Sequence, residues 1–90
     1  MSEPLNVLLL EDMEDDAFLV VQELELGGFQ LNWERLETSE ALQAALQRQV
    51  WDVVMSDYRM PQFSAPAALK IIQHRQIDLP FIVVSGMIGE

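Results

Sequence analysis

Short apolar runs alternate with longer amphipathic segments along the whole 90-residue chain. The runs predict strands over Leu5–Leu10, Leu31–Leu36, Val53–Ser56 and Phe81–Val84. The first is continuously apolar and the third is short and apolar, which is typical of strands buried within a sheet. The second alternates apolar and polar residues, as expected for an edge strand.

The three segments between these strands predict helices. The first begins with acidic residues, which suit the positive end of a helix dipole, and stops at a Gly-Gly pair. Thr38 or Ser39 can cap the second helix, while Ser64 can cap the third and Pro66 fits its first turn. The expected buried faces are Ala17, Val20, Val21 and Leu24 in the first helix, Ala41, Leu42, Ala45 and Leu46 in the second, and Ala65, Ala68, Leu69 and Ile72 in the third.

The alternation of strands and helices predicts a single α/β domain. Right-handed crossovers would give a parallel sheet with helices on both faces, although alternation alone does not determine the strand order. Helices on both faces require the direction in which successive strands are added across the sheet to reverse at some point. If the first and third strands flank this reversal, their carboxyl ends meet where open α/β sheets bind ligands.

Composition narrows the possible functions. The net charge of -10 disfavours direct contact with nucleic acids and anionic membranes. The chain has no cysteine, which excludes disulfides, thiolate metal sites and cysteine nucleophiles. Its apolar runs are too short to span a bilayer, and its start lacks the pattern of a signal peptide, so a cytoplasmic location is expected.

Polar residues follow three of the predicted strands. Glu11 and Asp12 follow the first, Asp57 the third and Ser85 the fourth. Each has a simpler explanation, because acids before a helix complement its dipole and aspartate and serine are common at turns. Their combination at one expected sheet edge is more specific and predicts a single site.

These residue types suit magnesium-assisted transfer of a phosphoryl group onto an aspartate. An aspartate is a weak nucleophile toward a dianionic phosphoryl group, and Mg²⁺ offsets the repulsion between the two. Asp12 and Asp57 could bind Mg²⁺ directly, and Glu11 could hold a metal-bound water. The Ser85 hydroxyl could donate to the phosphoryl oxygens, while Gly86 leaves room for the group to enter.

The segments VLLLED, VVMSDYRMP and LPFIVVSG resemble the receiver domain of two-component response regulators, and the resemblance covers essentially the whole chain. It implies a flavodoxin-like, doubly wound parallel sheet with strand order 2-1-3-4. It also implies that Asp57 is the phosphoacceptor, Glu11 and Asp12 the acidic pair, Ser85 the phosphate-sensing hydroxyl, and the Arg59 carbonyl a metal ligand. The implied donor is a histidine kinase or a phosphotransfer protein, and the domain would be a signalling phosphoprotein in a phosphorelay, not an enzyme.

The chain departs from the receiver pattern in one important way. Receivers carry a lysine after a fifth strand, whereas the sole lysine here is Lys70, in the third predicted helix. Residues 1–90 are therefore expected to form an incomplete receiver that lacks the fourth helix, the fifth strand and the last helix. An interaction module that is not phosphorylated remains an alternative. A phosphatase of the haloacid dehalogenase type is disfavoured because Arg59 stands where its second aspartate is required.

Truncation before a fifth strand also leads to an expectation about assembly. Phe81–Val84 would form an uncovered sheet edge without a charge or proline within it, and such an edge pairs readily with another chain. A homodimer or a swapped assembly through this strand is therefore expected.

Overall fold

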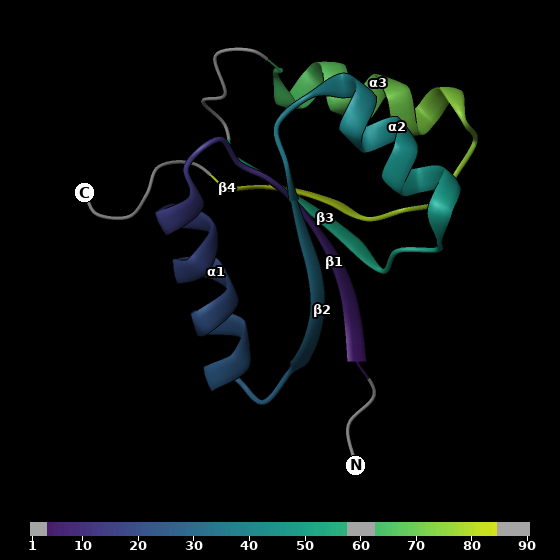
Figure 1. Cartoon of the computed structure of the whole chain (residues 1–90). Helices are drawn as coiled ribbons and strands as arrows, with labels where there is room; N and C mark the ends of the chain where they lie inside the picture. Colours follow the sequence, from purple (N-terminus) through teal and green to yellow (C-terminus); the bar gives the residue numbers. More distant parts are fainter. Residues whose placement is uncertain (1–3, 58–62, 85–90) are drawn as a thin grey trace.

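The computed structural model describes residues 4–57 and 63–84 of the chain (Figure 1). Seven elements follow one another in alternation. They are β1 (Pro4–Leu10), α1 (Glu14–Leu26), β2 (Gln30–Leu36), α2 (Ser39–Arg48), β3 (Val53–Asp57), α3 (Ala65–His74) and β4 (Phe81–Val84). All the predicted elements are present, with boundaries within about one residue of the predicted strands. In the described part of the chain, no helix is both long and apolar enough to cross a membrane.

The described strands form one parallel sheet in the order β2-β1-β3-β4. This confirms the flavodoxin-like arrangement that the sequence resemblance implied. β2 and β4 lie on opposite sides of the central pair β1 and β3. The direction in which successive strands are added across the sheet therefore reverses between β1 and β3. Leu10 of β1 pairs with Ser56 of β3, so both strands end at the same edge of the sheet.

Helices cover both faces of the sheet. α1 lies on one face and α2 and α3 lie together on the other (Figure 1). Alternate residues of β1 therefore enter two separate cores: Val7 and Leu9 pack with Ala17 and Val21 of α1, whereas Leu8 and Leu10 pack beneath α2 and α3. All four β1 side chains are almost completely buried, as their continuous apolar run predicted.

The N-termini of α2 and α3 are capped by the predicted hydroxyl side chains. The Thr38 hydroxyl accepts a hydrogen bond from the Ala41 amide, and the Ser64 hydroxyl accepts one from the Ala67 amide. Each satisfies one of the amides that a helix N-terminus leaves without an intrahelical partner. α1 ends at Gly27, and Gly28 has a φ of +99°, a left-handed conformation that favours glycine.

Two expectations about burial are wrong. Leu69 was expected on the buried face of α3 but is exposed, whereas Ala65, Ala68 and Ile72 are buried. Only the sides of α3 that face α2 and the sheet are covered, so the row of buried residues along this helix is narrow. β3 was expected to be buried throughout, yet Val53 and Met55 are only partly buried because α1 is the sole described helix on their face.

Candidate functional site

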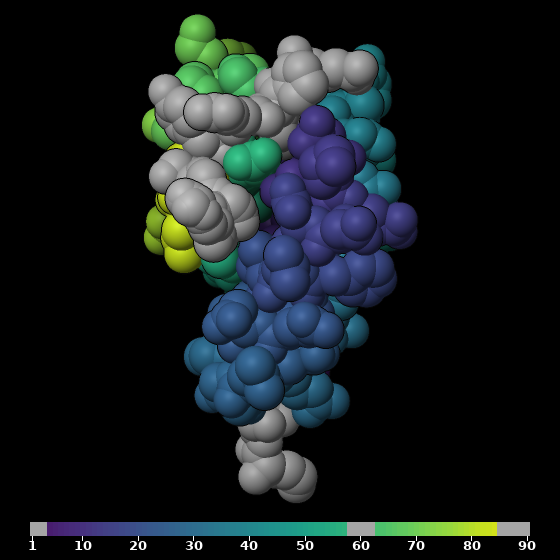
Figure 2. Space-filling view, turned by 90° about the vertical axis from the view of Figure 1, so that its left-hand side faces the viewer, coloured from purple at the N-terminus to yellow at the C-terminus, as the bar shows by residue number. Residues whose placement is uncertain are grey.

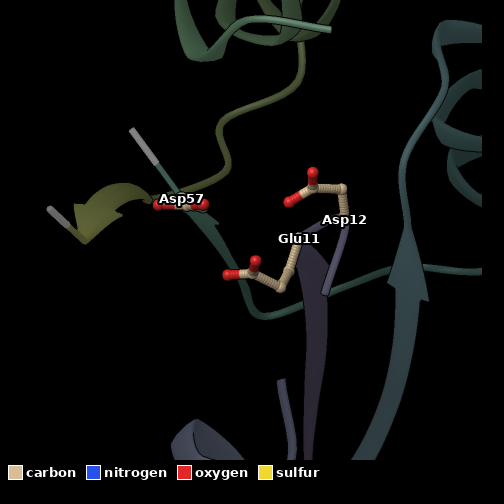
Figure 3. A group of neighbouring side chains, drawn as sticks. All are labelled: Glu11, Asp12 and Asp57. Carbon is tan, nitrogen blue, oxygen red and sulfur yellow. The ribbon is translucent and has the colours of Figure 1, made fainter. Parts of the chain in front are cut away.

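The carboxyl ends of β1 and β3 bring three acidic residues together. Glu11 and Asp12 directly follow β1, and Asp57 is the last residue of β3. Their carboxylates face one another across the edge of the sheet (Figure 3). This edge is also the point at which the strand order reverses, where open α/β sheets place ligands.

The three carboxylates are close enough to share one cation. One oxygen from each of Glu11, Asp12 and Asp57 lies within 4.8 Å of the other two. Glu11 is buried, whereas Asp12 and Asp57 are partly exposed, so the group opens to solvent on one side. Figure 2 views the α1 side of the molecule, where atoms from the end of β3 lie beside those of the β1–α1 segment.

Neighbouring backbone and side-chain groups hold Glu11 in place. Its amide donates to the Leu36 carbonyl at 3.1 Å, and its own carbonyl accepts from the Arg35 guanidinium at 3.2 Å. Its carboxylate Oε2 accepts a hydrogen bond from the Met13 amide at 3.2 Å. The carboxylate is therefore fixed at the start of α1 and cannot readily turn away from its acidic neighbours.

The pKa of Glu11 is raised from 4.5 to about 7. Burial of the carboxylate is the main cause, and the negative charges of Asp57, Asp16 and Asp12 raise it further. The hydrogen bond from the Met13 amide opposes these effects. The pKa shows that the ionised site is electrostatically unfavourable, a cost that a bound divalent cation would relieve.

The remaining predicted site residues cannot be placed. Arg59, Ser85 and Gly86 lie outside the described residues. Their assignments, to the metal for Arg59 and to the phosphoryl group for Ser85 and Gly86, stay predictions.

Two residues contribute to the site without having been singled out from the sequence. Arg35 fixes the Glu11 carbonyl, and Asp16 adds to the negative potential at the Glu11 carboxylate. Asp16 belongs to the acidic start of the first predicted helix, and that acidic start had been interpreted only as complementing the helix dipole. The signal for Arg35 was a charged residue at the end of an alternating strand, although only the β1–β2 pairing shows which carbonyl it reaches.

A cluster of this kind suits a hard divalent cation. Mg²⁺ binds oxygen ligands and in proteins often takes one or two carboxylates together with waters and phosphate oxygens. The open side of the cluster leaves space for such additional ligands. The arrangement can therefore bring a cation, an aspartate and an incoming phosphorylated group to the same point.

Comparison with known proteins agrees with this geometry, although no family model matches the chain. Over 86 residues the chain is 36% identical to the C4-dicarboxylate transport transcriptional regulatory protein DctD of Rhizobium meliloti (strain 1021). The match covers 96% of this chain but only 18% of that protein. The MaeR response regulator bound to beryllium trifluoride has a similar fold, with a TM-score of 0.77 and 20% identity over 94% of this chain and 70% of that chain. The sequence similarity to DctD and the fold shared with the MaeR response regulator together support a receiver domain for this chain.

Proposed function

We propose that the chain is the phosphoacceptor of a two-component signal transduction system and that Asp57 receives the phosphoryl group. The main support is the meeting of three carboxylates, within 4.8 Å of one another, at the point where the strand order reverses. Asp57 is the candidate nucleophile because it alone of the three comes from β3 and faces the acidic pair across the edge. The donor would be the phosphohistidine of a histidine kinase or of a phosphotransfer protein.

Mg²⁺ would be held by Asp12 and Asp57, with Glu11 binding through a water and the Arg59 carbonyl as a further ligand. The residues fit the ion in type and in separation, and the raised pKa of Glu11 marks negative charge that needs compensation. Bound there, the ion supplies the positive charge that lets a phosphorylated donor approach three carboxylates.

In the proposed reaction an oxygen of the Asp57 carboxylate attacks phosphorus. The phosphorus–nitrogen bond of the donor phosphohistidine breaks, and its electron pair stays on the imidazole, which takes a proton from solvent. Asp57 becomes an acyl phosphate. The Ser85 hydroxyl and the Gly86 amide would donate hydrogen bonds to the transferred phosphoryl oxygens. Hydrolysis of the acyl phosphate would restore the carboxylate, so the domain would carry out only its own phosphorylation and dephosphorylation.

A small phosphodonor tests this proposal directly. Acetyl phosphate and Mg²⁺ should add one phosphoryl group to the chain, as measured by intact-protein mass spectrometry. Asp57→Asn should abolish the addition, whereas Asp78→Asn, an equivalent change at an exposed site on the loop before β4, should leave it unchanged. Labelling that persists in Asp57→Asn, or that does not need a divalent cation, would overturn the assignment.

The second candidate is a receiver-like interaction module that is not phosphorylated. Among the described residues no lysine lies beside the carboxylates, since Lys70 is exposed on the helix α3. Beryllium trifluoride distinguishes the two candidates, because this phosphoryl mimic is the ligand of the similar MaeR response regulator. A phosphoacceptor should bind it with Mg²⁺ and lose that binding with Asp57→Asn, whereas an interaction module should not bind it.

A further inference from the structure

α2 and α3 lie together on one face of the sheet (Figure 1). Residues from these two helices and from the end of α3 line a groove of about 440 Å³. Its lining, from both helices and the C-terminal cap of α3, consists of Gln43, Lys70, Ile71, His74 and Arg75. We call this feature the α2–α3 groove. It differs from the acidic site in position, because α3 runs back from the carboxyl end of β3 toward the start of β4 and the groove lies along its second half.

The charge of the α2–α3 groove is opposite to that of the protein. The chain carries a net charge of -10, yet none of the lining residues is acidic and three can carry positive charge. Elsewhere in the described chain, Arg35 and Arg48 form ion pairs with Glu37 and Glu34. Lys70 and Arg75 make no ion pair with any other described residue. The unpaired cations of the described chain are thus concentrated in one groove.

The helix dipole explains only part of this arrangement. His74 and Arg75 lie at the C-terminal end of α3, where positive charge is favourable. Lys70 lies one turn earlier and gains little from the dipole, which acts mainly within the last turn. Lys70 nevertheless lines the same groove, together with Gln43 of α2, whose side-chain amide donates a hydrogen bond to the Ser39 hydroxyl.

The groove is too exposed to enclose a small molecule. Lys70, His74 and Gln43 are exposed, and Ile71 and Arg75 are only partly buried, whereas small-molecule sites bury most of the ligand. A nucleic acid would extend its phosphates beyond the few cations into the field of an acidic protein. A helix with one acidic and one apolar stripe matches the groove better, because carboxylates could pair with the rim while apolar side chains contact Ile71.

We propose that the α2–α3 groove is a docking site for an acidic amphipathic helix of a partner protein. The partner would lie along α2 and α3, with its carboxylates near Lys70, His74 and Arg75. The groove shares no residue with the acidic site, so docking does not require phosphorylation of Asp57. The interaction should weaken as salt screens the exposed charges.

A pair of identical substitutions tests the groove. Gln43→Glu places a carboxylate in the groove on α2, and Gln22→Glu places one on the exposed surface of α1. Both change the net charge equally, and circular dichroism checks that both variants are folded. The probe is a fluorescent synthetic helix of glutamate and leucine at helical spacing, with a scrambled peptide of the same composition as its control. Fluorescence anisotropy measures binding, and amide chemical shifts in NMR spectra locate it.

The expected result is saturable binding of the helical peptide, but not of the scrambled one, with shifts at the residues that line the groove. Gln43→Glu should weaken binding by up to roughly fivefold, the upper end of the range for one exposed charge pair, and Gln22→Glu should not. Absence of saturable binding, equal effects of the two variants, or shifts confined to other elements would overturn the proposal. Self-association of the unmodified chain that Gln43→Glu alone abolishes would also overturn it, because the occupant would then be the acidic helix α1 of a second copy.

Discussion

Replacing Glu11 with glutamine should stabilise the fold at neutral and alkaline pH. A pKa raised from 4.5 to about 7 means that the folded chain binds the Glu11 proton more tightly than the unfolded chain does. Folding stability therefore falls as pH rises through this interval, because ionisation is more costly in the folded state. Above pH 7 the ionisation of Glu11 lowers the free energy of unfolding by about 3 kcal/mol. About 2 kcal/mol of this loss develops between about pH 5.5 and about pH 8.

Urea unfolding measures this effect through the fluorescence of Trp51, which is buried in the core beneath α2 and α3. The relevant quantity is the difference in the free energy of unfolding between Glu11→Gln and the unmodified chain. It is measured in the presence of EDTA at about pH 5.5 and at about pH 8. This difference isolates Glu11 from the other carboxylates. It should grow in favour of the variant by about 2 kcal/mol as the pH rises.

The matched control is Glu25→Gln, because Glu25 is exposed on α1 and its replacement should give nearly the same difference at both pH values. Added Mg²⁺ should reduce the advantage of Glu11→Gln, since the cation stabilises only the ionised site. A difference that is independent of pH, or that favours the unmodified chain more strongly as the pH rises, would refute the electrostatic reasoning.

Three further predictions address the metal site, the core and the assembly. Asp12→Asn should weaken Mg²⁺ binding roughly tenfold or more in calorimetric titration, while Asp78→Asn should not; equal losses would indicate diffuse attraction in place of a site. In α3, Ile72→Ala should cost about 2–5 kcal/mol of unfolding free energy and Leu69→Ala less than about 1 kcal/mol, so similar costs in urea unfolding would contradict the observed burial. The unmodified chain should sediment as a dimer at micromolar concentration, and Val83→Lys should dissociate it, because Val83 is 46% exposed on a strand that is paired on one side among the described strands. A monomer unaffected by that change would exclude pairing through β4.

Local features of the fold could be predicted from the sequence because their causes are local. Apolar runs of strand length, hydroxyl caps at Thr38 and Ser64, and the Gly-Gly pair after α1 act over a few residues each. The convergence of Glu11, Asp12 and Asp57 could also be anticipated, although it depended on the reversal lying between the first and third strands. Alternation of strands and helices allows several strand orders, so the observed order had to come from resemblance and then from the structure itself.

Tertiary structure alone decided which surfaces are covered and how the acidic residues affect one another. The helical period places Leu69 near Ala65, Ala68 and Ile72, but only the packing of α3 against α2 and the sheet determines where the buried stripe ends. Likewise, the sequence presents Glu11 as one acid among many. Its burial and its three acidic neighbours, one of them 46 positions away by residue number (57 minus 11), determine its raised pKa. Desolvation and charge coupling depend on distances between segments remote in sequence, and these distances exist only once the sheet has formed.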